Sequence, residues 1–110
     1  MNVIAQFTVI PIGTGTSLSG YVAACERVLA ATGLTYELHA NGTNLEGDWE
    51  AVMDAIKGCH EALHGMGVPR IATNVTLGTR TDRPQRMAEK LSSVQAKLAD
   101  HEVGATLAAT

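Results

Sequence analysis

Hydrophobic and polar residues alternate along two long segments, one at the start of the chain and one in its second half. Residues 2–12 place one set of side chains on each face, Val3, Ala5, Phe7 and Val9 against Ile4, Gln6, Thr8 and Ile10. Residues 68–80 repeat this pattern, with Ile71, Thr73, Val75 and Leu77 on one face. A period of two is typical of a β-strand with one buried face. Both segments are therefore predicted to be strands, with the apolar faces beneath helices.

Three other segments repeat hydrophobic residues every three or four positions, which is the period of an amphipathic helix. The first is expected to begin at a serine cap, Ser17 or Ser19, and to end near Thr32, before Gly33. The second is expected over about 49–64, and the third over 84–101, with a proline at its first position.

Two short strands are predicted between the first two helices, over 34–40 and 43–46, joined by an Asn41-Gly42 turn. Asp48 then follows as the expected N-cap of the second helix. The resulting order is βαββαβ with an added C-terminal helix. Such an order gives an antiparallel four-stranded sheet with two helices on one face. We therefore predict an α+β, ferredoxin-like sandwich over residues 1–100, followed by a flexible C-terminal tail, 101–110.

The sheet face opposite the helices carries uncharged polar residues, namely Gln6, Thr8, Asn74 and Thr76. Amides and hydroxyls suit a surface that is buried but hydrated, such as a contact between two sheets or the wall of a ligand pocket. The alternative is an ordinary solvated sheet face on which threonine is favoured by its β-propensity.

Composition places the chain among small globular domains. Its 110 residues are 45% hydrophobic but only 4% aromatic, and 17% are charged. Disordered chains are poor in apolar residues and rich in charge, so that class is excluded. A domain of this size with few large side chains has a thin core and surplus apolar surface. We therefore expect a homo-oligomer.

Charge and cysteine content narrow the choice of partners. The net charge is −3 and no run of Lys or Arg occurs, which argues against nucleic acid. No apolar stretch approaches the roughly 20 residues that span a bilayer, and residues 1–13 resemble a strand rather than a signal peptide. Cys25 and Cys59 lack a CxxC spacing and are expected to be buried free thiols. The predicted location is the cytoplasm.

One motif points to an enzyme. His60-Glu61-x-x-His64 matches the zinc-protease helix, in which two histidines one turn apart bind zinc and the glutamate acts as general base. Against this interpretation, the helix is expected to end at Gly65, and a third ligand must come from elsewhere. A zinc-dependent hydrolase therefore stays the alternative to a binding protein, and no metal site is predicted.

Residues 41–47, Asn-Gly-Thr-Asn-Leu-Glu-Gly, resemble the Gly-Thr-x-(apolar)-Glu-Gly signature of the thiamine-binding protein family of small ferredoxin-like proteins. Flanking matches follow in the expected order: Ser17-Leu18-Ser19 before Tyr21-Val22, then Thr32-Gly33-Leu34-Thr35-Tyr36, Cys59-His60 and Gly67-Val68-Pro69-Arg70-Ile71. The resemblance covers about residues 3–97. Asn41 departs from the family pattern, which often has an apolar residue there, and this difference concerns the rim of the expected pocket.

The resemblance implies a homotetramer that binds thiamine or its hydroxymethylpyrimidine moiety as a ligand, without established catalytic activity and without a further cofactor. The expected ligand-binding residues are Thr43, Asn44, Glu46, Tyr36, Ser19 and Asn74. The carboxylate of Glu46 can engage the amine and ring nitrogen of an aminopyrimidine, and Tyr36 or Trp49 can supply a stacking face. The alternatives are a solvated carboxylate for Glu46, core or interface packing for the aromatic residues, and a structural oligomer without ligand.

Overall fold

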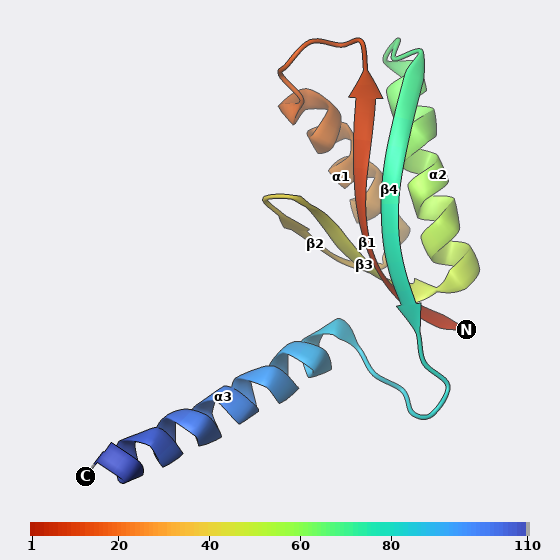
Figure 1. The fold of residues 1–110 in the computed structure, drawn as a ribbon. Helices are drawn as coiled ribbons and strands as arrows, with labels where there is room; N and C mark the ends of the chain where they lie inside the picture. The colour runs from red at the N-terminus through yellow and green to blue at the C-terminus, as the bar shows by residue number, and fades with distance from the viewer. Residues whose placement is uncertain (110) are drawn as a thin grey trace. The chain divides into compact units, whose positions relative to one another are not determined.

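The structure, a computed structural model, describes residues 1–109, with side chains described for residues 1–100. Its elements confirm the βαββαβ order with a C-terminal helix (Figure 1). They are β1 (Asn2–Ile12), α1 (Ser19–Thr32), β2 (Thr35–His39), β3 (Gly42–Asp48), α2 (Trp49–Gly65), β4 (Arg70–Thr79) and α3 (Met87–Ala109). The chain divides into two compact units, Met1–Thr79 and Arg80–Thr110, and each is described by itself. Among the described residues, no helix combines the length and hydrophobicity needed to cross a membrane.

The first unit is an antiparallel sheet in the strand order β2-β3-β1-β4, with α1 and α2 on one side (Figure 1). In the central strand, Phe7 pairs with Thr43 of β3 and with Val75 of β4. Paired residues of neighbouring strands point to the same face, so these three side chains all lie on the helix-covered side. The fold is therefore the α+β, ferredoxin-like sandwich that the hydrophobic pattern predicted.

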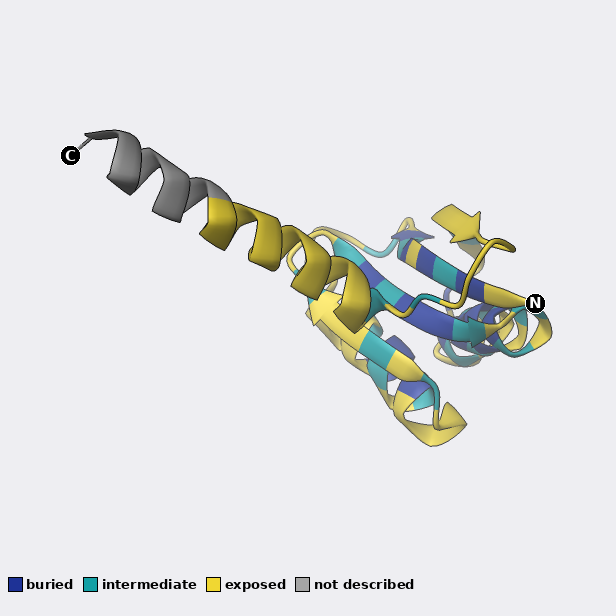
Figure 2. Ribbon diagram, turned by 90° about the horizontal axis from the view of Figure 1, so that it is seen from below, coloured by how far each residue is buried: buried dark blue, intermediate teal, exposed yellow. Residues whose placement is uncertain are grey.

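The core lies between the two helices and the inner strands. Its buried apolar residues are Val3, Ala5, Phe7, Ala24, Cys25, Leu29, Leu45, Val52, Ala55, Ile56, Cys59, Leu63 and Val68. Burial falls sharply from β1 to the edge strand β4 (Figure 2). Val75 and Leu77 are on the predicted face but remain 40% and 37% exposed, because a strand at the sheet edge is only partly covered. Their predicted burial beneath the helices is wrong.

The helix ends in the first unit follow the sequence signals in part. Gly33 ends α1 in the left-handed conformation, with φ of 76°, as predicted. The N-cap of α1 is Leu18 rather than a serine, and no side chain caps this end. Asp48 occupies the predicted N-cap position of α2 but makes no capping bond, because its carboxylate accepts a 2.8 Å hydrogen bond from the Met1 amino group.

The third helix begins later and ends later than the sequence predicted. Pro84 lies before its first residue, Met87, and one of the two contacts of a capping box forms at this end. The side chain of Glu89 accepts a hydrogen bond from the backbone N–H of Arg86, and the Glu89 N–H donates to the Arg86 carbonyl oxygen. The helix continues to Ala109, beyond the expected end near His101. The predicted flexible tail, 101–110, lies outside the residues whose side chains are described.

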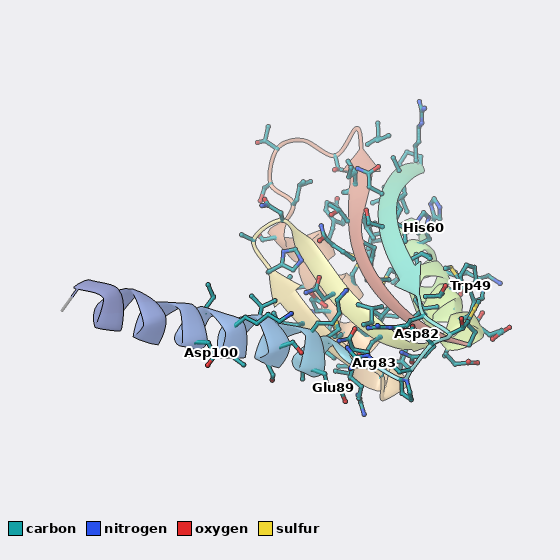
Figure 3. The ribbon with its side chains drawn as sticks, turned by 60° about the horizontal axis from the view of Figure 1, so that its bottom comes forward. Trp49, His60, Asp82, Arg83, Glu89 and Asp100 are labelled. Atoms are coloured by element: carbon teal, nitrogen blue, oxygen red, sulfur yellow. The ribbon has the colours of Figure 1, made fainter. Side chains whose placement is uncertain are left out.

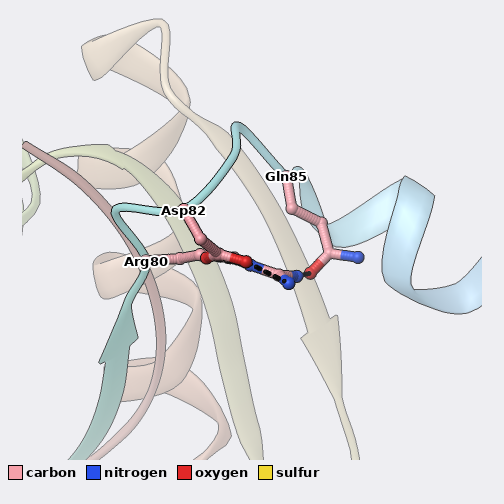
Figure 4. A network of polar contacts seen from close by, with 3 residues as sticks. All are labelled: Arg80, Asp82 and Gln85. Atoms are coloured by element: carbon pink, nitrogen blue, oxygen red, sulfur yellow. Dashed lines mark hydrogen bonds and ion pairs between the residues drawn. The ribbon is translucent and has the colours of Figure 1, made fainter.

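An ion pair precedes α3 (Figure 4). Arg80 donates from Nε to Oδ1 of Asp82 at 2.6 Å and from Nη2 to Oδ2 at 2.8 Å, while Nη1 donates to Gln85 Oε1 at 2.8 Å. This two-point contact stabilises the ionised carboxyl. It lowers the pKa of Asp82 to about 2.

We expect the Asp82 carboxyl to titrate near pH 2 in the intact protein and near its ordinary value of roughly 4 in Arg80→Gln. Because the ion pair lowers the pKa of Asp82 in the folded protein, it stabilises the folded state at pH values above the pKa of Asp82 in the unfolded chain. This stabilisation is lost as the pH falls toward 2. Carboxyl carbon shifts followed by NMR measure both values. Arg83→Gln is the control, since only the backbone of Arg83 contacts this carboxyl. An unchanged midpoint in Arg80→Gln would contradict the assignment of the lowered pKa to Arg80.

Candidate ligand-binding site

A cavity of about 400 Å³ lies between α1, the helix-facing side of β1 and the β2–β3 hairpin. Helix α1 lines it with four side chains, Tyr21, Val22, Cys25 and Glu26. These positions share one side of a helix, since they are spaced by one, three and four residues. The volume falls within the roughly 300–1,000 Å³ of pockets that hold small molecules.

The floor of the cavity is formed by the central strands. Phe7 and Val9 of β1 contribute apolar surface, and Thr43 of β3 contributes a hydroxyl. Thr43 is only 6% exposed, and its Oγ1 donates a 2.9 Å hydrogen bond to Oε1 of Glu26. The bond joins β3 to α1 across the cavity floor.

The second carboxylate oxygen of Glu26 is the unusual group in this site. Oε2 is buried and has no hydrogen-bond partner among the described residues. Leaving a buried acceptor unsatisfied costs about 1–3 kcal/mol, and more for a charged group. Glu26 lines the cavity, and a turn of its side chain would bring this buried acceptor to a hydrogen-bond donor or a cation bound there.

The hairpin closes the cavity by lying directly against β1. Thr8 Oγ1 donates a 2.9 Å hydrogen bond to the carbonyl oxygen of Asn41. At Gly42, a Cβ atom would lie 2.8 Å from the carbonyl oxygen of Phe7, a distance that real side chains do not adopt. The approach of the two backbones therefore requires glycine at this position.

His39 is held at the same end of the hairpin. Its Nδ1 accepts a 3.3 Å hydrogen bond from the backbone N–H of Asn41. The proton of a neutral ring is then on Nε2, which lies 3.2 Å from Oδ1 of Asn44 and donates to it. These two contacts fix both the orientation and the tautomer of the imidazole at the cavity rim.

The structure does not bring the six predicted ligand-binding residues together. Thr43 lines the cavity, but Asn44 pairs with Gln6 and Glu46 pairs with Ile4, which places both on the opposite face of the sheet. Glu46 is buried on that face.

The remaining three predicted residues lie apart from the cavity lining. Ser19 is exposed at the start of α1. Tyr36 pairs with Leu45 and packs against the core from β2. Asn74 is exposed on β4, opposite Thr8. The polar sheet face thus lies mostly outside the cavity, whose lining it joins at Thr8.

Sequence reasoning missed Glu26. The available signal is a charged residue directly beside the buried stripe of α1, at Cys25 and Leu29. The position of Glu26 becomes informative only when α1 is known to lie over Thr43, because the hydrogen bond between Glu26 and Thr43 joins residues far apart in the chain.

The two histidines of the zinc-protease motif have partners within the fold. His60 extends from α2 beside β4 and is hydrogen-bonded through Nε2 to Thr73 Oγ1 (Figure 3). His64 donates from Nδ1 to the carbonyl oxygen of Val68 at 2.7 Å. His60 thereby holds α2 to β4, and His64 holds the end of α2 to the loop that precedes β4. Across the described part of the chain, no three His, Cys, Asp or Glu residues lie together in a way that could hold a metal ion.

Known proteins resemble this chain along most of its length. The family model described as thiamine-binding protein matches residues 5–95. A UPF0045 protein of Synechocystis is 56% identical over 95 residues, which is 86% of this chain and 78% of that protein.

Solved structures of other proteins also resemble this chain along most of its length. A hypothetical protein of Methanocaldococcus jannaschii superposes with a TM-score of 0.79 at 31% identity, covering 86% of this chain and 96% of that one. A Thermotoga maritima protein, described provisionally as a thiamine biosynthesis or salvage protein, shares the fold with a TM-score of 0.73 at 20% identity, over 86% and 99%. The prediction made from the Gly-Thr…Glu-Gly segment is confirmed: the chain belongs to the thiamine-binding protein family.

Proposed function

We propose that this protein binds thiamine or its hydroxymethylpyrimidine moiety, without transforming it, in the cavity between α1, β1 and the β2–β3 hairpin. The observation that carries the proposal is the buried, unpartnered Oε2 of Glu26 at a cavity of ligand size. Membership in the thiamine-binding family supplies the ligand class.

The chemistry of the ligand complements this acceptor. The exocyclic amine of the pyrimidine donates to Oε2 of Glu26, while the Thr43 hydroxyl donates to Oε1. A hydrogen bond to an ionised carboxylate is about twice as strong as one between neutral groups. The positive thiazolium ring of intact thiamine is favoured by the same negative charge. Phe7 and Tyr21 provide aromatic surface for the ring systems.

The proposed assembly is a homo-oligomer, and a tetramer by the family resemblance. Support comes from the apolar residues that β4 leaves exposed, Val75 and Leu77, at the edge of the sheet. A second copy covering them removes apolar surface from water. The proposed location is the cytoplasm, since Cys25 and Cys59 are both free thiols.

Isothermal titration of the full chain with thiamine and with hydroxymethylpyrimidine tests the proposed binding. We expect saturable binding of both, one ligand per chain, and weaker binding of the thiazole moiety, which lacks the exocyclic amine. Amide chemical shifts in α1 and residues 38–43 are expected to change on titration. The absence of heat and of shift changes at millimolar ligand would contradict the proposal.

A further inference from the structure

Two thiols meet in the packed interface between α1 and α2. Cys25 and Cys59 are both buried, and the Cys59 thiol donates to the backbone carbonyl oxygen of Cys25 at 3.8 Å. The helices approach closely at this level. A Cβ added at Gly58, next to Cys59, would lie 3.0 Å from Cγ1 of Val28, one turn beyond Cys25. The Cys59 sulfur therefore contacts the backbone of Cys25, and the two cysteines are neighbours across this interface.

The two cysteines differ in their access to small molecules. Cys25 lines the cavity, beside Glu26, whereas Cys59 is fully buried behind it. They differ in acidity as well. A hydrogen bond with the Cys59 thiol lowers the pKa of Cys25, while the same bond and burial raise the pKa of Cys59. The thiolate, which is the reactive form of cysteine, is thus favoured at the residue that borders the cavity.

We propose that Cys25 is a thiol modification site, at which a small disulfide that enters the cavity reacts and from which Cys59 forms an intramolecular disulfide. In the first step, the Cys25 thiolate attacks one sulfur of the small disulfide, forms a mixed disulfide and releases one thiolate, which takes up a proton. In the second, Cys59 loses its proton and attacks Sγ of Cys25, which releases the second small thiol. The protein loses two hydrogen atoms, and the small disulfide is reduced to two thiols.

The reaction changes the candidate ligand site at both stages. The mixed disulfide places an adduct in the cavity, and the Cys25–Cys59 bond then joins α1 to α2. Glu26 is adjacent to Cys25 in the same helical turn. We therefore expect ligand affinity to differ between the reduced and oxidised protein. This consequence for the ligand rests on the proposed function, whereas the covalent chemistry does not.

The test uses the reduced, ligand-free full chain and bis(2-hydroxyethyl) disulfide, a small neutral reagent, with intact mass and non-reducing peptide maps as readouts. We expect the wild-type protein to lose two hydrogen atoms and to contain a Cys25–Cys59 peptide. Cys59→Ser is expected to accumulate one adduct on Cys25, and Cys25→Ser to leave Cys59 unmodified. The rate should rise with pH through a midpoint below that of Cys25 in the unfolded chain, because the hydrogen bond with Cys59 lowers the pKa of Cys25.

An unmodified Cys59→Ser protein, equal modification of Cys59 in Cys25→Ser, or a wild-type reaction that stops at the mixed disulfide would overturn the proposal. The corresponding alanine variants repeat the test for any serine variant that circular dichroism finds unfolded. Thiamine added beforehand is expected to slow modification of Cys25. If Cys25 reacts at the same rate with and without thiamine, the cavity assignment of the ligand fails while the cysteine chemistry stands.

Discussion

Replacing Glu26 with glutamine is expected to lower the affinity for thiamine by about 10- to 100-fold. The expected loss follows from the hydrogen bond between the ligand amine and the carboxylate, since bonds to charged groups contribute about 1.5–3 kcal/mol and each 1.4 kcal/mol is tenfold in affinity. Glutamine keeps the size of the side chain and retains an oxygen that can accept from Thr43. Titration calorimetry on the two proteins measures the difference.

Glu46→Gln is the matched control, because it removes a carboxylate on the opposite face of the sheet, outside the cavity lining. Its affinity for thiamine is expected to equal that of the unaltered protein. A loss in Glu46→Gln together with full binding in Glu26→Gln would place the ligand on the polar sheet face instead. Thermal unfolding of both variants checks that a lost affinity is not a lost fold, and Glu26→Gln is expected to be at least as stable because it removes a buried, incompletely paired charge.

Truncating Leu45 to alanine is expected to lower the free energy of unfolding by about 2–5 kcal/mol, the range measured for large-to-small changes in protein cores. Leu45 is fully buried, and in β3 it lies between Ala5 of β1 and Tyr36 of β2. The loss of stability has two causes: the removed methyl groups no longer make apolar contacts, and their removal leaves a cavity beneath the helices. Urea denaturation followed by circular dichroism measures it.

Leu38→Ala makes the same chemical change one strand away, at a side chain that is 53% exposed. Its effect on unfolding is expected to stay within roughly 1 kcal/mol, because surface substitutions away from special features are usually small. Leu38 and Leu45 are on the same face of the sheet, so equal losses in the two variants would contradict the assignment of Leu45 to the buried core and of Leu38 to its exposed margin.

The fold could be predicted from the sequence because its elements carry strong local signals. The alternation in β1 predicted the helix-covered face, and Gly33 predicted the end of α1. The errors occurred where distant contacts decide the outcome. Asp48 is drawn from its capping role by the amino group of Met1, and Val75 stays exposed because β4 is an edge strand.

The candidate site was only partly predictable. Thr43 and Glu46 belong to one motif, yet they are separated by an odd number of positions, so a strand places them on opposite faces. The predicted strand already contained this information. Glu26 was out of reach, because its contact with Thr43 depends on the packing of α1 over β3.

The strand order also limits when the native sheet can be completed during synthesis. The first strand to be synthesised occupies the interior of the sheet, and the last strand, β4, completes it through ten residue pairs from Val3–Thr79 to Ile12–Arg70. Pairings between residues distant in the chain form slowly, because loop closure costs entropy before the contacts are made. A nascent chain that ends before Arg70 exposes one whole edge of β1. The native sheet is therefore reached only after Thr79 has been synthesised.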